Sequence, residues 1–95
     1  MSTNLDRGIL LFDQSRYKQA EDEFRQAIAV EPRQAYAHAM LGLCLSYQQR
    51  YDEAETEVRE AIHLEPGLAW AHYAHACVLH ERNDFSGSRK AVDEA

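Results

Sequence analysis

The 95-residue sequence predicts an all-α fold, an α-solenoid of antiparallel helical hairpins. Two observations lead to this prediction: one repeat runs through the whole chain, and each repeat contains two stretches with apolar residues at helical spacing. The length allows one small domain, and 45% apolar with 27% charged residues is an ordinary globular composition. We therefore expect a single domain over 1–95.

The repeat has a period of 34 residues, which separates Pro32 from Pro66, each preceded by a glutamate. Aromatic, small and leucine positions recur in the same register: Tyr17, Tyr51 and Phe85; Gly8, Gly42 and Ala76; Leu11, Leu45 and Leu79; Ala20, Ala54 and Ser88; Ala27, Ala61 and Ala95. The repeats accordingly cover 1–34, 35–68 and 69–95, and the last one is incomplete.

Two helices are predicted in each repeat. The first pair is expected near 3–14 and 18–30, and the third pair near 69–82 and 86–95, in register with the second. The second pair is predicted at 34–49, which is rich in Ala and Leu, and at 52–64, where apolar residues have helical spacing. Asp52, with Glu55 three residues later, is typical of a capping box, and Pro66 ends the fourth helix.

A helix–turn–helix unit with this period and these positions resembles the tetratricopeptide repeat. The second unit has the most matches: Leu41, Gly42, Leu45, Tyr51, Ala54, Ala61 and Pro66. Four positions depart from the pattern: Asn4 and Arg7, where large apolar residues are expected, His75 in place of leucine, and Ser88 in place of alanine. The resemblance covers the whole chain and implies a right-handed superhelix whose first helices line a concave surface.

The first helices of the second and third repeats have no charged residue over 34–49 and 67–80, whereas 52–65 is rich in carboxylates. A helix that is apolar on all sides is either buried or part of an interface. With the placement that the resemblance implies, the predicted partner-binding groove contains Leu5, Ile9, Phe12, Tyr36, Ala39, Met40, Leu43, Tyr47, Trp70, Tyr73 and Cys77. The alternative, that this stripe only packs neighbouring first helices together, stays open, particularly for Ala39, Ala74 and Cys77.

The predicted groove indicates the chemistry of a partner. Some tetratricopeptide repeats bind a C-terminal carboxylate through Lys, Arg and Asn. The matching positions here are Leu5, Ile9, Met40, Leu43, Trp70 and Ala74, so no such clamp is present. We therefore predict a protein-interaction module for an apolar or aromatic peptide or helix with basic flanks, which would complement the acidic rim.

Two alternatives remain open. The chain could self-associate through the same apolar face, or through the helix end near Ala91, Val92 and Ala95. It could also be a non-catalytic domain of a larger protein, because the third repeat stops within its second helix. We expect either a fragment of a longer array or an end that another chain covers.

Charge and composition exclude other partners. A net charge of −6 argues against nucleic acid and against an anionic membrane surface. No apolar run approaches the length of a membrane span or forms a signal peptide, and two cysteines do not make a disulfide framework. A reducing, cytoplasmic location is therefore expected.

No catalytic site, metal site or cofactor is predicted. His72 and His75 share a helix face, but Cys77 and His80 point elsewhere, so packing roles are favoured over metal binding. Cys77 and His80 lack a recognisable third catalytic group. The carboxylates of the second helices are expected to form a solvated face, with supporting pairs Glu21–Arg25 and Glu55–Arg59.

Overall fold

The computed structural model describes residues 3–94, with side chains described for 3–83. This part of the chain folds into the helices α1 (Asn4–Asp13), α2 (Tyr17–Val30), α3 (Ala35–Tyr47), α4 (Tyr51–Leu64) and α5 (Ala69–Glu94). The predicted all-α fold is confirmed, and the first four predicted helices are found with ends that differ by at most two residues.

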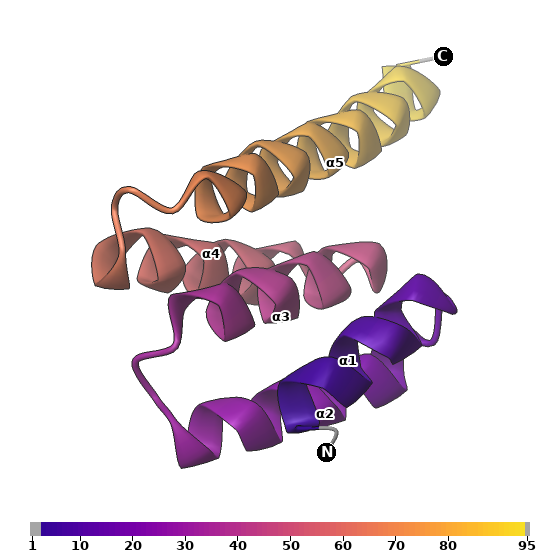
Figure 1. Ribbon diagram of the computed structural model, residues 1–95. Helices are drawn as coiled ribbons and strands as arrows, with labels where there is room; N and C mark the ends of the chain where they lie inside the picture. The colour runs from indigo at the N-terminus through magenta and orange to yellow at the C-terminus, as the bar shows by residue number, and fades with distance from the viewer. Residues whose placement is uncertain (1–2, 95) are drawn as a thin grey trace.

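The helices stack as hairpins along one direction (Figure 1). α1 pairs with α2, and α3 pairs with α4; α2 also packs against α3, and α5 packs against both α3 and α4. Figure 1 shows α1 and α3 in front of their hairpin partners α2 and α4. The first helices of the repeats therefore share one side of the solenoid.

α3 is the centre of the core. Residues 37–46 are all buried, including Leu41 and Leu45, of which 1% and 0% are exposed. The helix contacts α1, α2, α4 and α5, so it has neighbours on every side. This explains why its sequence contains no charged residue: a charge there would lose its hydration without gaining a partner.

Close packing within each hairpin depends on the repeated glycines. A Cβ atom at Gly42 would clash with Val58 Cγ1 of α4, and one at Gly8 would clash with the Phe24 ring of α2. Glycine at these positions therefore allows the two helices of a hairpin to approach each other.

The hairpin turns repeat in backbone detail. Ser15 and Gln49, one period apart, adopt positive φ angles of 61° and 63°. The next backbone amide in each turn, from Arg16 or Arg50, then donates to the carbonyl of Leu11 or Leu45 at 2.9 Å. These turns place Tyr17 and Tyr51 at the first positions of α2 and α4.

The prediction of a capping box at Asp52 is wrong. α4 begins at Tyr51, its N-cap is Arg50, and no side chain caps it, so Asp52 already lies in the first helical turn. The capping box of the described chain is at α1, where Thr3 Oγ1 accepts from the Asp6 amide at 3.1 Å and Asp6 accepts from the Thr3 amide at 3.2 Å. The register set by Tyr51 therefore outweighs the local capping signal of Asp52.

The predicted break between helices at 69–82 and 86–95 is also wrong, because α5 continues without interruption to Glu94. No Gly or Pro occurs between residues 80 and 86 to force a turn. A left-handed residue such as Ser15 or Gln49 costs about 1–2 kcal/mol, which the first two repeats recover by packing a second helix against the first. Local sequence alone permits the continuous helix.

One carboxylate of the second helices is not solvated as predicted. Glu21 in α2 is buried, with 1% of it exposed, and it contacts the turn between α3 and α4. Gln48 Nε2 donates to its Oε1 at 3.1 Å, and the Arg50 guanidinium lies 2.9 Å from the same oxygen. Glu21 thus joins the first repeat to the second.

The predicted pairs within the helices are confirmed. Arg25 lies 2.8 Å from Glu21 Oε2, and Arg59 lies 2.6 Å from Glu55 Oε1. No helix of the described residues combines the length and apolar character needed to cross a membrane.

Candidate functional site

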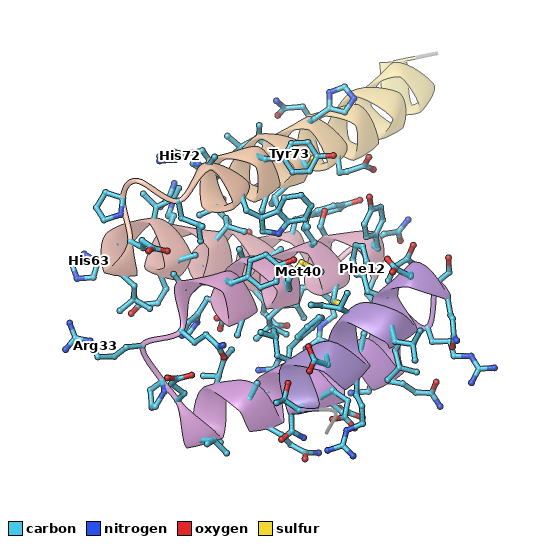
Figure 2. The ribbon with its side chains drawn as sticks, viewed as in Figure 1. Phe12, Arg33, Met40, His63, His72 and Tyr73 are labelled. Carbon is cyan, nitrogen blue, oxygen red and sulfur yellow. The ribbon has the colours of Figure 1, made fainter. Side chains whose placement is uncertain are left out.

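Six aromatic side chains from α1, α2, α3 and α5 form a group that we call the aromatic surface: Phe12, Tyr17, Tyr36, Tyr47, Trp70 and Tyr73. Figure 2 shows Phe12 and Tyr73 on the side that the first helices form, with Met40 below Tyr73 and to the left of Phe12 in this view. The surface consists of two ring clusters.

The first cluster lies where α1 ends and α2 begins. The Tyr17 and Tyr47 rings stack with centroids 4.8 Å apart and an angle of 18° between their planes. Phe12 contacts both, with its centroid 5.5 Å from Tyr17 and 5.7 Å from Tyr47. Three helices therefore hold these rings in fixed positions.

The second cluster joins the start of α3 to the start of α5. Trp70 lies between Tyr36 and Tyr73, with ring centroids 6.1 Å and 5.0 Å away. Its indole Nε1 donates to the Met40 sulfur at 3.1 Å. Trp70 is half-buried and covers Met40, so it contributes both to the core and to the surface.

The predicted groove residues separate by burial. Tyr47 and Tyr73 are the most exposed of them, with 49% and 56% of their surface accessible to solvent. Leu5, Ile9, Phe12, Tyr36, Trp70 and Cys77 are half-buried. Met40, Leu43 and Ala39 are buried at 2%, 3% and 0% exposed, so in the free chain they support the surface from below.

Tyr17 belongs to this site, although the sequence identified it only as a repeated aromatic position. Its half-buried ring stacks on Tyr47, which the sequence did place in the groove. The repeat register placed Tyr17 at the start of a second helix, and only the three-dimensional arrangement brings it against a first helix.

The surface has acidic neighbours. Burial raises the pKa of the Tyr36 phenol, and the negative charge of Asp13 raises it further. Burial likewise raises the pKa of Tyr47, with smaller contributions from Tyr17, Cys77 and the Glu81 carboxylate. Asp13 and Glu81 are therefore within electrostatic reach of the aromatic rings, and both are exposed.

The two cysteines differ in environment. Cys44 is fully buried, and this burial raises the pKa of its thiol to about 12. Cys77 is half-buried beside Tyr73, and its hydrogen bond to the phenol raises the pKa of Tyr73. Both are free thiols, and Cys44 has the character of a core residue.

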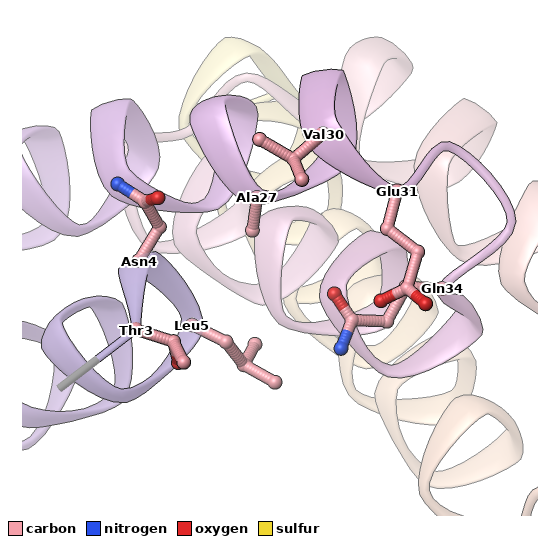
Figure 3. Close-up of a pocket in the computed structure, with 7 residues that line it drawn as sticks. All are labelled: Thr3, Asn4, Leu5, Ala27, Val30, Glu31 and Gln34. Carbon is pink, nitrogen blue, oxygen red and sulfur yellow. The ribbon is translucent and has the colours of Figure 1, made fainter. Parts of the chain in front are cut away.

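A separate pocket of about 180 Å³ lies between the start of α1 and the end of α2 (Figure 3). Its lining consists of Thr3, Asn4, Leu5, Ala27, Val30, Glu31 and Gln34. Leu5 is the predicted groove residue found there. The structure thus assigns Leu5 to the wall of a shallow pocket and does not bring it into the aromatic surface.

The histidines at one repeat position make a repeated structural contact. His38 Nε2 lies 2.8 Å from the Pro32 carbonyl oxygen, and His72 Nε2 lies 2.6 Å from that of Pro66. His38 Nδ1 also lies 2.8 Å from Glu57 Oε2 of α4. These rings hold the turns between repeats, and no three His, Cys, Asp or Glu side chains among the described residues are arranged to hold a metal ion.

Antiparallel hairpins stacked in register, with one aromatic side formed by first helices, define an α-solenoid of helical hairpins. The family model described as tetratricopeptide repeat matches residues 5–69. This match covers more than half of the chain, so the chain belongs to the tetratricopeptide repeat family. Members of this family generally mediate protein–protein interactions and are typically non-catalytic. No curated protein matches the sequence.

Proposed function

We propose that this chain is a non-catalytic interaction module that binds an apolar or aromatic peptide or helix of a partner protein on its aromatic surface. The observation that supports this proposal is the exposure of Tyr47 and Tyr73, at 49% and 56%, beside the half-buried Trp70. Trp and Tyr are enriched among the residues that dominate binding energy at protein interfaces.

Ring packing also prepares the surface for binding. Tyr47 is stacked on Tyr17, and Tyr73 lies against Trp70, so these side chains are already restricted before a partner arrives. Association then costs less side-chain entropy than it would for mobile residues. The smaller loss of side-chain entropy leaves more of the favourable contact energy to stabilise the complex.

A cytoplasmic location is part of the proposal, and the free thiols Cys44 and Cys77 support it. Structural disulfides are typical of oxidising compartments, whereas unpaired cysteines suit a reducing one.

The proposal is tested with peptides selected from a random display library against the full chain. We expect Tyr47→Ala and Tyr73→Ala each to weaken the selected peptides about tenfold, because each removes an exposed ring at the proposed contact. Calorimetric titration measures the dissociation constants. Val30→Ala is the matched control, because Val30 is an apolar residue of α2 with 81% exposed and lies outside the aromatic surface.

Circular dichroism should show the same helix content in all three variants, because each substituted residue is about half exposed or more. Selected peptides that bind both tyrosine variants as tightly as the wild type would show that the binding site lies elsewhere.

A further inference from the structure

We infer that the partner segment presents an arginine side chain to the aromatic surface, stacked on Tyr47 or Tyr73 and paired with Asp13 or Glu81. This inference rests on the proposed function and adds the chemistry of the partner. It follows from three features of the surface: exposed tyrosine rings, two carboxylates without an ion-pair partner among the described residues, and the absence of Lys and Arg from α3 and from the segment 67–80.

The first feature is the accessibility of the rings. Tyr47 and Tyr73 each expose about half of their surface, and the Tyr47 phenol contributes to the raised pKa of Tyr73. Cys77, one turn after Tyr73 in α5, hydrogen-bonds to Tyr73 and also contributes to the raised pKa of Tyr47. Two aromatic faces are thus available near one another for a planar cation.

The second feature is the pair of carboxylates. Asp13 ends α1 directly after Phe12, and Glu81 lies one turn after Cys77 in α5; both are exposed, and neither takes part in an ion pair among the described residues. Other acidic side chains are engaged: Glu23 lies 3.7 Å from Arg7, and Glu53 lies 2.8 Å from Arg50. The carboxylates beside the rings therefore have their charge available for a partner.

The third feature is the absence of Lys and Arg from α3 and from the first part of α5. Neither α3 nor the segment 67–80 contains Lys or Arg. Arg82 of α5 is directed to α4, where it lies 3.3 Å from Asp52. Arg16 is exposed at the N-cap of α2, in the turn that precedes Tyr17. Among the described residues, Arg7 of α1 and Arg82 of α5 are thus paired with carboxylates of α2 and α4.

Arginine satisfies these groups better than lysine does. The guanidinium is planar, stacks on aromatic rings, and pairs with carboxylates through two parallel hydrogen bonds, whereas the ammonium of lysine is a strongly hydrated point charge. A net charge of −6 also favours approach of a cationic segment over an acidic one. Leucine or similar residues next to the arginine would contact the half-buried Phe12 and Trp70.

The test uses three acetylated, amidated pentapeptides that alternate leucine with arginine, glutamine or glutamate. Each is titrated into the full chain at low salt, and binding is followed by NMR. The indole N–H of Trp70 is a unique reporter because the chain has one tryptophan. We expect the arginine peptide to shift this signal in a saturable way, with an affinity at least about fivefold above that of the glutamine peptide, and the glutamate peptide to bind most weakly.

Removing the carboxylates tests their role. The double variant Asp13→Asn with Glu81→Gln should bind the arginine peptide about three- to tenfold more weakly and leave the glutamine peptide unchanged. The matched control is Glu60→Gln with Glu65→Gln, which removes the same charge from exposed positions at α4. This control should keep nearly the wild-type affinity for the arginine peptide.

Two results would overturn the inference: equal affinities for the arginine and glutamine peptides, or equal losses in the double variant and its charge control. Either result leaves the proposed function standing as long as the peptides shift the Trp70 signal. The proposed function itself is wrong if none of the three peptides shifts the Trp70 signal and the display-selected peptides bind Tyr47→Ala and Tyr73→Ala as tightly as the wild type.

Discussion

At the scale of single residues, Glu21 shows how one side chain can fix two repeats relative to each other. Burial disfavours its ionised form, but the hydrogen bonds from Gln48 and Arg25 and the charges of Arg50 and Arg25 outweigh that cost and lower its pKa. The carboxylate is bound both within α2 and across to the turn before α4. Its ionised state is therefore part of the folded structure.

Glu21 should make stability depend on pH. Its pKa is lowered in the folded state, so the unfolded chain takes up the proton first, and the stabilisation present above about pH 4.5 is lost as the pH falls through the folded pKa. Glu21→Gln should cost about 1–3 kcal/mol at pH 7 and reduce the slope of stability against pH in this acidic range.

Urea unfolding of the wild type and Glu21→Gln at a series of pH values measures both effects. Asp22→Asn is a suitable control, because the Asp22 side chain is 58% exposed and its ion-pair partner among the described residues is the exposed Lys18, at 3.5 Å. Parallel curves for the wild type and Glu21→Gln below pH 4.5 would contradict this role of Glu21.

At the scale of the helix, the contact between α3 and α4 depends on Gly42. An added Cβ would clash with Val58 Cγ1 and lie 3.1 Å from the backbone oxygen of Ala54, so the neighbouring helix itself limits the space. Val58 and Ala54 are fully buried, which leaves them little room to move. The close packing of α3 against α4 therefore requires glycine at position 42.

Gly42→Ala should destabilise the chain by about 1–3 kcal/mol, because an added methyl group overpacks a buried contact. Gly67→Ala provides the matched control: a Cβ there meets nothing within 4 Å, so we expect a change near zero or a small gain in stability. Thermal and urea unfolding measure both variants. A second substitution, Val58→Ala, should recover part of the loss in Gly42→Ala by making space, and failure to do so would contradict the proposed clash.

At the scale of the whole molecule, the net charge and the exposed aromatic rings have opposite effects on self-association. The aromatic surface favours contact with another apolar surface, whereas a net charge of −6 and the exposed Asp13 and Glu81 oppose contact with a second copy of the same chain. Self-association through this surface would place like charges side by side. A partner with the opposite charge does not meet this barrier.

We therefore expect the chain to be a monomer in low salt. Light scattering across a concentration series should give the mass of one chain, 10.9 kDa, throughout. Added salt screens exposed charges and should increase any self-association. A dimer that strengthens with concentration at low salt would instead support an oligomerisation unit, and Tyr73→Ala should then weaken that dimer if the aromatic surface forms the contact.

The sequence by itself determined the repeat, the first four helices and the residue types on the first helices. Those features are local or periodic, so they can be predicted without knowledge of distant contacts. Examples are the helical spacing of apolar residues, the helix end before Pro66, and the shared repeat position of Gly8 and Gly42. The division of the chain into repeats at 1–34, 35–68 and 69–95 stays a prediction.

Tertiary structure alone decided the rest, because burial and partners depend on residues far apart in sequence. It placed Met40 and Leu43 in the core and left Tyr47 and Tyr73 open, although all four share a helical stripe pattern in the sequence. It buried Glu21 beside Arg50, 29 residues away, and stacked Tyr17 on Tyr47. It also let α5 continue where the repeat predicted a turn, because a continuous helix avoids the cost of about 1–2 kcal/mol that a left-handed turn residue carries.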